Sequence, residues 1–330
     1  RELSFSRGIT KNLFTDTSIA FLKKRKVFYI LSALVVGFGI YSLATRGLDE
    51  SVEFTGGRAY RVEFGQKINR EEVKDAIALN CLDAQGNKVQ PGVKTVNNDY
   101  TLEITTKYNE EANVVDASIE KAFNDLGFNV VNNQDAEVGS SEYKIQSSRG
   151  VEGQISDELK RNSFLAIIFS LFIIFIYIAY RFRKWQFGLG ALIAMFHDVL
   201  VVLGLFSIFY NYVPFSMEID QAFIAAILTV VGYSINDTVV VFDRIREYSI
   251  LHKKSSATQV VDRALNSTLS RTINTSLSTF IVLLTIFIFG GESIKGFSFA
   301  LMVGVVVGTY SSLFIATPLV VDISKDKISS

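Results

Sequence analysis

AFIAAILTVVGYSINDTVVVFDRIRE, residues 222–247, is the stretch that decides the fold. Residues 222–242 carry one charge, that of Asp237, and match the length of about 20 residues with which a helix crosses a bilayer. Burying a carboxylate there costs about 2.5–3.5 kcal/mol on insertion scales, so Asp237 is expected to carry protons or couple ion movement. The alternative is a structural bond to a neighbouring helix through Asn236 or Ser234, a task that an Asn or Ser performs at lower cost.

Composition places the whole chain in a membrane. Of its 330 residues 49% are hydrophobic, 27 are Phe, and the mean hydropathy is +0.29. Basic and acidic residues number 33 each, so bulk charge gives no case for a nucleic-acid partner. The only cysteine, Cys81, excludes an intrachain disulfide and a cysteine-based metal site and is expected to pack as a small apolar group. Because the chain starts with Arg1, we expect a piece of a longer polypeptide.

Basic clusters beside the apolar runs predict the topology. Residues 23–26, KKRK, precede the first run, which places a connector at 1–26 in the cytoplasm and sends the first transmembrane helix, 27–46, outward. Residues 47–162 are then an extracytoplasmic domain, and residues 163–330 hold five more helices with a cytoplasmic loop at about 243–270. The apolar runs in this second part are residues 164–180, 187–210, 222–242, 273–289 and 297–321. Six spans result, with both termini in the cytoplasm.

The polar region after the first span reads as a β-α-β-β-α-β domain. Strands are predicted at 58–64, 93–96, 100–106 and 128–138, and a second helix at 114–126. Asn69 caps the first helix with Glu72 three residues on, and its apolar face is formed by Val73, Ala76, Ile77 and Leu79. This order predicts a ferredoxin-like α+β domain, a fold too common to indicate a function by itself.

Further polar groups fall inside the predicted spans. Arg271 lies at a similar depth to Asp237 and either pairs with it or snorkels to lipid phosphate. His197 and Asp198, near the middle of the third span, form either a proton relay or a structural pair. Residues at helical spacing in 257–270 predict an amphipathic helix that packs under the bundle or binds lipid. A polar seam between the fourth and fifth spans acts as interhelical glue or as a water path; it comprises Ser234, Asn236, Asn274, Ser276 and Ser278.

At these residues the sequence resembles the SecF family, the smaller half of the bacterial SecD–SecF protein-export complex in the resistance-nodulation-division superfamily. The carriers are 53–57 EFTGG, 196–199 FHDV, 232–247 GYSINDTVVVFDRIRE and 271–276 RTINTS. Two stretches depart from the family pattern: 51–54 is SVEF in place of Gly-(Ile/Val)-Asp-Phe, and 150–153 is GVEG without the usual proline. Residues expected to have structural roles in these motifs are Phe54, Thr55, Gly56, Gly57, Asn236, Asp243 and Arg244.

The resemblance implies one half of a pseudo-symmetric twelve-helix bundle in the bacterial cytoplasmic membrane. It implies a subunit, not an enzyme and without a cofactor, that uses the proton-motive force to promote export. The implied partners are SecD, fused or separate, the SecYEG translocon, exported preproteins and membrane lipid. Asp237 and Arg271 would belong to the proton pathway, with His197 and Asp198 as further candidates.

Three other functions compete with this interpretation. An intramembrane aspartyl protease would use Asp198 and Asp237 as a dyad, but such enzymes carry Gly-x-Gly-Asp, which is absent around Asp237. A small-molecule exporter of the same superfamily would usually need two large outer domains and twelve spans of its own. A purely structural anchor of the translocon predicts that Asp237→Asn is silent.

Overall fold

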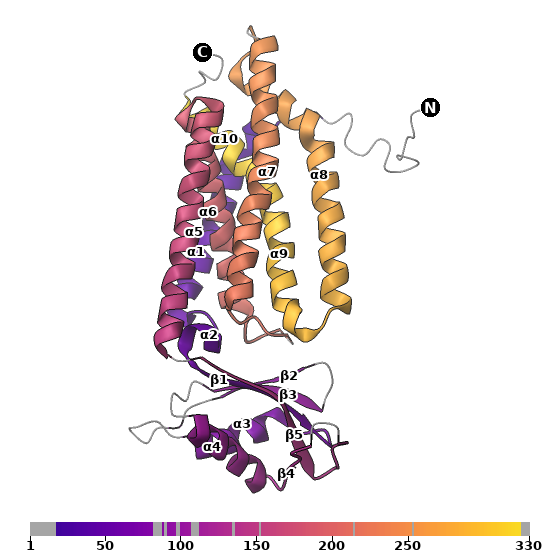
Figure 1. Cartoon of the computed structure of the whole chain (residues 1–330). Coiled ribbons are helices and arrows are strands. Elements are labelled where there is room, and N and C mark those ends of the chain that lie inside the picture. Colours follow the sequence, from indigo (N-terminus) through magenta and orange to yellow (C-terminus); the bar gives the residue numbers. More distant parts are fainter. Residues whose placement is uncertain are drawn as a thin grey trace, which may run out of the picture.

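The computed structural model describes residues 18–81, 88, 91–96, 100–106, 112–133, 136–151, 153–213, 215–252 and 254–324. In this part of the chain, long helices form a bundle, and a small domain of strands and helices lies at one end of it (Figure 1). The helix α1 leads into the domain and α5 leads out of it, so the domain is an insertion between the first two long helices.

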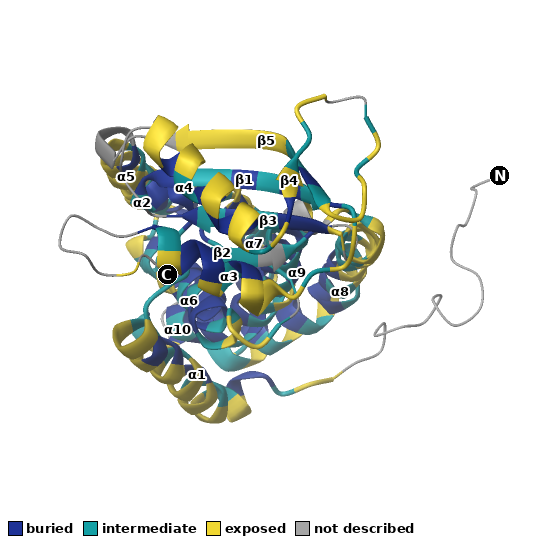
Figure 2. Cartoon of the chain, turned by 90° about the horizontal axis from the view of Figure 1, so that it is seen from below, coloured by how far each residue is buried: buried dark blue, intermediate teal, exposed yellow. Residues whose placement is uncertain are grey.

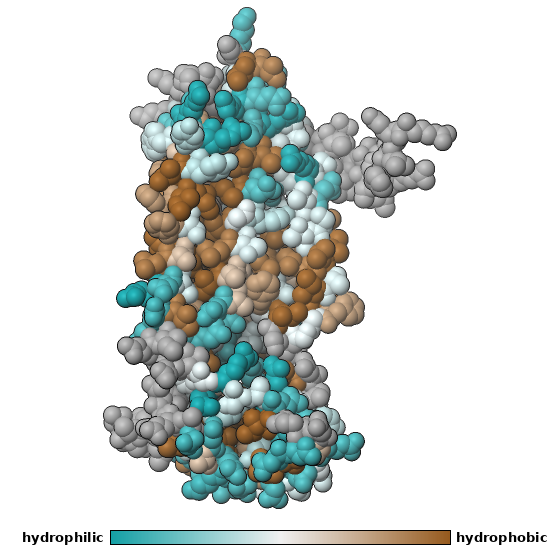
Figure 3. Space-filling model, viewed as in Figure 1, coloured by the Kyte–Doolittle hydropathy of each residue, from teal (hydrophilic) through white to brown (hydrophobic). Residues whose placement is uncertain are grey.

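Six helical runs among the described residues are long and apolar enough to cross a membrane, which confirms the prediction of six spans. Windows of α1, α5 and α8 are only 17%, 11% and 17% buried, and Figure 3 shows the resulting apolar band beside the hydrophilic domain. The chain is therefore built as a multi-pass membrane protein. The runs are η2 with α1 (Leu22–Lys24, Arg25–Arg46), α5 (Gly153–Phe182), α6 (Trp185–Phe209), α7 (Gln221–Leu251), α8 (Ala257–Phe289) and α9–η3–α10 (Glu292–Ser311, Ser312–Ala316, Thr317–Ile323).

The helices α7 and α8 are longer than the sequence analysis expected. The residues of the expected cytoplasmic loop at about 243–270 are largely helical, because α7 continues to Leu251 and α8 runs without a break from Ala257. Neither helix contains proline, and Phe242, Ile245, Val261 and Leu265 pack together in one buried cluster. The predicted amphipathic helix is thus the first part of α8, and it packs against α7 within the bundle.

A five-stranded sheet forms one layer of the inserted domain. The strand order is β2-β3-β1-β5-β4, with every neighbouring pair antiparallel except the short β4–β5 pair. The helices α3 and α4 cover the face of the sheet that is turned away from the bundle (Figure 1). The elements are β1 (Gly57–Phe64), α3 (Arg70–Asn80), β2 (Gly92–Thr95), β3 (Thr101–Thr106), α4 (Ala112–Asp125), β4 (Asn129–Val130) and β5 (Glu142–Val151).

The last strand differs from its prediction. Among the described residues of the strand expected at 128–138, only Asn129–Val130 form a strand, and the strand next to β1 on the side opposite β3 is β5; residues 134–135 lie outside the described part. Among the residues 142–150 of β5, Tyr143 alone is fully buried, while much of the strand carries polar side chains such as Lys144 and Gln146. This pattern hid the strand, because a one-sided strand with few apolar residues gives a weak signal.

The domain has its own core, built on the alternation of β1. Tyr60, Val62 and Phe64 are buried, and the Phe64 ring makes an edge contact with Phe123 of α4 at 5.3 Å. Asn69 caps α3 by accepting a hydrogen bond from the Glu71 amide at 3.1 Å, as its position predicted. Within the expected apolar face of α3, the assignment of Leu79 is wrong, because this residue is 59% exposed.

Two consecutive glycines join the membrane helices to β1. A short helix, α2 (Val52–Thr55), ends at Gly56, and both Gly56 and Gly57 have positive φ, 73° and 113°. Side chains other than glycine rarely adopt this backbone, so the pair is required by the turn. Phe54 is buried in the bundle core and the Thr55 hydroxyl donates to the Ser51 carbonyl at 3.1 Å. The expected structural role of these motif residues thus has a local geometric basis.

Candidate functional site

Asp237 lies where α7, α8 and α9 meet. Its side chain is almost completely buried, at 3% exposure. The hydroxyls of Ser276 on α8 and Thr309 on α9 donate to its Oδ2 at 3.4 and 3.5 Å, and these two hydroxyls lie 2.6 Å from each other. The carboxyl group is therefore held by neutral hydroxyl groups from two neighbouring helices, a setting that accommodates both the protonated and the ionised form.

Arg271 does not form a close ion pair with Asp237. Arg271 is exposed. No ion pair shorter than 4.0 Å joins its side chain to the Asp237 carboxylate among the described residues. The arginine lies five residues before Ser276 on the same helix.

A second buried carboxylate, Asp198, has a separate set of partners. It is fully buried on α6, and its Oδ2 accepts hydrogen bonds from Ser234 of α7 at 2.6 Å and Ser311 of α9 at 2.8 Å. The neighbouring His197 places Nδ1 3.0 Å from Asp198 Oδ1. Because Asp198 and Asp237 have different hydroxyl partners, the described contacts do not form a dyad that shares one proton.

Four consecutive residues, the last three of α9 and the first of η3, connect the two carboxylates, and sequence reasoning missed all of them. Thr309 contacts Asp237, Ser311 contacts Asp198, and the Ser312 hydroxyl lies 2.7 Å from that of Thr238 on α7. Tyr310 places its ring 6.0 Å from the His197 ring. The signal was present as a run of hydroxyl residues, TYSS, inside the last apolar segment, where α9 passes into the π-helical turn η3. Such turns are frequent at functional sites of helices.

Glycines bring α9 close enough to α7 for these contacts. A Cβ placed on Gly308 would lie 3.0 Å from Ser234 Cβ, and one on Gly304 would lie 2.0 Å from a methyl carbon of Val230. Such close approach between membrane helices is what small residues permit. The packing therefore fixes the hydroxyl groups of α9 against the two carboxylates.

The predicted polar seam divides into a buried and an exposed part. Ser234 and Ser276 are buried against the carboxylates, whereas Asn236, Asn274 and Ser278 are exposed. With Arg271, the exposed residues define an open polar face on α7 and α8, and Figure 3 shows pale and teal surface over these helices amid the apolar band. Polar groups at such positions in a bilayer normally face protein or water and not lipid.

Asp243 and Arg244 tie α7 to its neighbours at the end of the bundle remote from the domain. Asp243 pairs with Arg181 of α5 at 3.3 Å. Arg244 pairs with Glu247 at 2.7 Å, and its Nε donates to the Ser267 hydroxyl of α8 at 3.0 Å. These exposed contacts hold helix ends together and lie away from the buried carboxylates.

Comparison with known proteins identifies the family. The family "Protein export membrane protein SecD/SecF, C-terminal" matches residues 130–326, and the "SecD/SecF GG Motif" matches residues 41–68. The protein translocase subunit SecF of Rhodothermus marinus is 39% identical over 94% of this chain and 95% of its own length. SecF of Haemophilus influenzae is 34% identical over 92% of this chain and 85% of its own length.

Solved structures agree with this assignment. SecDF of Thermus thermophilus, described as a translocon-associated membrane protein, superposes with a TM-score of 0.79 at 28% identity over 97% of this chain. A crystal structure of SecDF in a super-membrane-facing form gives 0.65 at 29% identity over 94% of this chain. The chain spans only about 40% of the SecDF length. The chain belongs to the SecF family of protein translocase subunits.

Proposed function

We propose that this SecF chain works with SecD to couple inward proton movement to the export of polypeptides across the cytoplasmic membrane. The observation that carries the proposal is the buried carboxyl group of Asp237, held by Ser276 and Thr309 without a close cation. A carboxyl group in that position gains and loses a proton at modest cost, because hydroxyls donate to the ionised form and accept from the protonated one.

The proton pathway would combine several of the residues above. Arg271, exposed near the start of the membrane part of α8, would approach Asp237 when that carboxyl ionises and withdraw when it is protonated. His197 and Asp198 would extend the pathway through the hydroxyls of α9, since Thr309 contacts Asp237 and Ser311, two residues further on, contacts Asp198. Motion of α9 against α7 would then accompany proton transfer.

The overall architecture proposed is one half of a twelve-helix bundle of the resistance-nodulation-division type. The strand order β2-β3-β1-β5, with α3 and α4 on one face, supports a ferredoxin-like domain carrying one extra short edge strand. The positive-inside rule supports an orientation in which this domain would lie outside and both termini in the cytoplasm. SecD would cover the open polar face of α7 and α8, which otherwise exposes Asn236 and Asn274 to lipid.

The remaining partners follow from this placement. The domain would lie on the side where an exported preprotein leaves the SecYEG channel, and the membrane helices would contact SecD and lipid. The chain would act as a transport subunit that catalyses no covalent step. The small-molecule exporter is not favoured, since the relatives are named as translocase subunits.

The test is export of a precursor into vesicles that hold the complete complex, with and without an imposed proton gradient. Asp237→Asn should assemble normally and lose only the gradient-dependent part of export, because the amide cannot carry a proton. Asp243→Asn is the matched control, since it removes a carboxylate from the same helix at an exposed position, and it should keep the full response. A full response in Asp237→Asn would contradict the proposal.

A further inference from the structure

The segment that precedes β1 is hydrogen-bonded to the segment that precedes α7. The Ser51 amide donates to the Ile219 carbonyl at 3.0 Å, and the Ile219 amide donates to the Asp49 carbonyl at 2.7 Å. Glu50 and Ile219 form a parallel β-bridge. The base of the inserted domain is thus bound, backbone to backbone, to the chain that enters α7.

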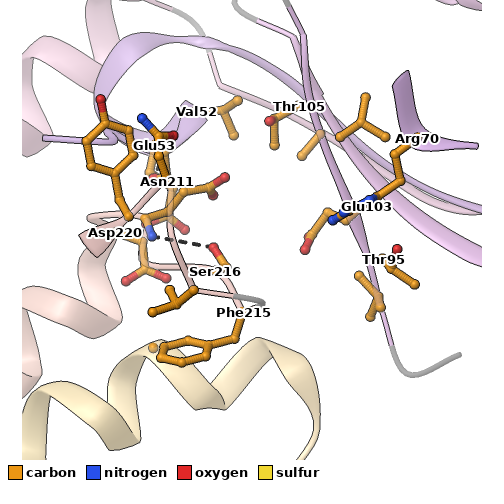
Figure 4. A pocket seen from close by; sticks show the side chains of 18 of the residues that line it. Val52, Glu53, Arg70, Thr95, Glu103, Thr105, Asn211, Phe215, Ser216 and Asp220 are labelled. Carbon is orange, nitrogen blue, oxygen red and sulfur yellow. Dashed lines mark hydrogen bonds between the residues drawn. The ribbon is translucent and has the colours of Figure 1, made fainter. Parts of the chain in front are cut away.

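A carboxylate from this segment also caps α7. Glu53, on α2, accepts a hydrogen bond from the amide of Gln221, the first residue of α7, at 2.9 Å. Asp220 caps the same helix by accepting from the Phe223 amide at 2.7 Å. Figure 4 shows the Glu53 and Asp220 side chains near each other at the edge of a cleft between the domain and the bundle. Anionic groups at a helix N-terminus are stabilised by the free amides and the helix dipole.

Burial and a neighbouring charge both affect the Asp220 carboxyl at this cap. Burial raises the pKa of the Asp220 carboxyl above its usual value, and the nearby Glu53 charge raises it further. Two carboxylates therefore share one helix end, and the one that comes from another element, Glu53, is the one that links the domain to the helix. Losing its bond would leave the Gln221 amide without that partner.

Apolar packing makes the same connection rigid. Phe54, the neighbour of Glu53 on α2, lies in one buried cluster with Ile219 and Phe223 at the start of α7. On the other side, Lys160 of α5 contacts Glu50 at 2.6 Å. The segment from 49 to 55 is therefore held between α5 and α7, and a displacement of the domain acts on α7 directly.

The helix α7 carries such a displacement to the proton site. It is one uninterrupted helix from Gln221 to Leu251, and Asp237 lies sixteen residues after Gln221, about 24 Å along the axis. We propose that Glu53 is a positioning residue: by binding the start of α7 it couples the position of the domain to the position of Asp237 against Ser276 and Thr309. This inference rests on the proposed role of Asp237 as the proton carrier and names the contact through which that role is coupled to the domain.

Two substitutions act on the contact from opposite sides, one by removing its donor and the other by removing the charge of its acceptor. Gln221→Pro deletes the amide that Glu53 accepts from, and proline suits the first position of a helix. The preceding Asp220 already has the extended backbone, φ −125° and ψ −175°, that a following proline requires. Glu53→Gln keeps the shape of the side chain and removes its charge. Glu71→Gln is the control, since Glu71 lines the same cleft from α3.

Each variant is studied in the complete complex in vesicles with two readouts. The first is gradient-dependent export of a precursor. The second is the rate at which dicyclohexylcarbodiimide, a reagent for protonated carboxyls in apolar surroundings, modifies Asp237, followed by mass spectrometry. We expect Gln221→Pro to change the modification rate about tenfold, the population shift that corresponds to one charge-assisted hydrogen bond, and to lower gradient-dependent export. Glu53→Gln should act in the same direction with a smaller effect, because its amide oxygen still accepts the bond without the charge, and the double variant should match Gln221→Pro alone.

The outcomes separate this inference from the proposed function. If both variants leave the modification rate of Asp237 and the gradient response at the level of Glu71→Gln, Glu53 does not position the proton site, whatever Asp237→Asn does. Additive effects in the double variant would also overturn it, because the two substitutions would then act through different contacts. A misfolded Gln221→Pro leaves Glu53→Gln as the deciding variant. If Asp237→Asn itself keeps the full gradient response, the proposed function fails first.

Discussion

Adding a single methyl group at Gly204 is expected to disrupt the contact between α1 and α6. The helix α1 buries only three of its residues, Ser32, Gly39 and Ser42. Gly39 meets Gly204 of α6 backbone to backbone, and the Ser42 hydroxyl lies 2.9 Å from that of Ser207. Figure 2 shows that the rest of α1 is largely exposed at the edge of the bundle. Its attachment therefore depends on this narrow strip of small residues.

The size of the effect follows from the spacing. A Cβ on Gly204 would lie 2.7 Å from Gly39 Cα, whereas a Cβ on Gly39 would lie 3.1 Å from Gly204 Cα. Ordinary van der Waals contact begins at 3.4 Å, so the distance from the new Cβ to the facing Cα is 0.7 Å too short in Gly204→Ala and 0.3 Å too short in Gly39→Ala. Overpacking of this kind costs about 1–3 kcal/mol. Alanine also favours a helix over glycine by up to about 1 kcal/mol, which partly conceals the steric cost.

Gly37→Ala isolates the steric part. Gly37 lies on α1 two residues before Gly39, and a Cβ there meets nothing within 4 Å. Thermal unfolding of the purified protein in detergent should give its lowest midpoint for Gly204→Ala, an intermediate one for Gly39→Ala, and one at or above wild type for Gly37→Ala. Equal midpoints for Gly204→Ala and Gly37→Ala would refute the reasoning, because α1 and α6 would then accommodate the added methyl group without loss of stability.

Three further predictions concern other parts of the chain. Burial raises the pKa of the Cys81 thiol from 9.0 to about 11, so maleimide labelling of this thiol should be slow at pH 8 and become faster as the pH rises. The stability of the domain should fall as the pH rises from 9 towards 11, because the thiol ionises at a lower pH in the unfolded chain than in the folded one. Ile77→Ala should destabilise the domain by about 2–5 kcal/mol and accelerate Cys81 labelling, whereas exposed Leu79→Ala should stay within about 0.5 kcal/mol. Ser311→Ala removes a donor to Asp198 and should cost about 0.6–1.7 kcal/mol in thermal unfolding, more than Ser324→Ala, whose buried hydroxyl has no partner among the described residues.

Much of the fold could be predicted from the sequence because its signals are local. Hydropathy alone marks six membrane helices and singles out Asp237, since a bilayer imposes length and excludes charge. The cap at Asn69 follows from one side chain and its own backbone. The turn at Gly56 and Gly57 follows from their freedom to adopt positive φ.

The parts that escaped prediction depend on packing between distant segments. Ser311 and Thr309 look unremarkable within an apolar run, and only the approach of α9 to α6 and α7 turns them into partners of carboxylates. The lengths of α7 and α8 escaped because charged residues beyond a membrane span resemble a loop when only hydropathy is considered. Leu79 shows the converse limit, since an apolar residue near the helical spacing of its neighbours still faces solvent.

The pairing of β1 with β5 determines how the inserted domain can transmit force. Gly57, where β1 begins, is paired with Val151, where β5 ends, so both connections to the membrane helices leave the sheet at the same end of one antiparallel pair. A load that draws the domain away from the membrane pulls both strands in one direction and does not slide one past the other. The load therefore does not shear the hydrogen bonds between β1 and β5. The sheet can stay intact while the load acts on α2 and α5, which connect it to the membrane helices.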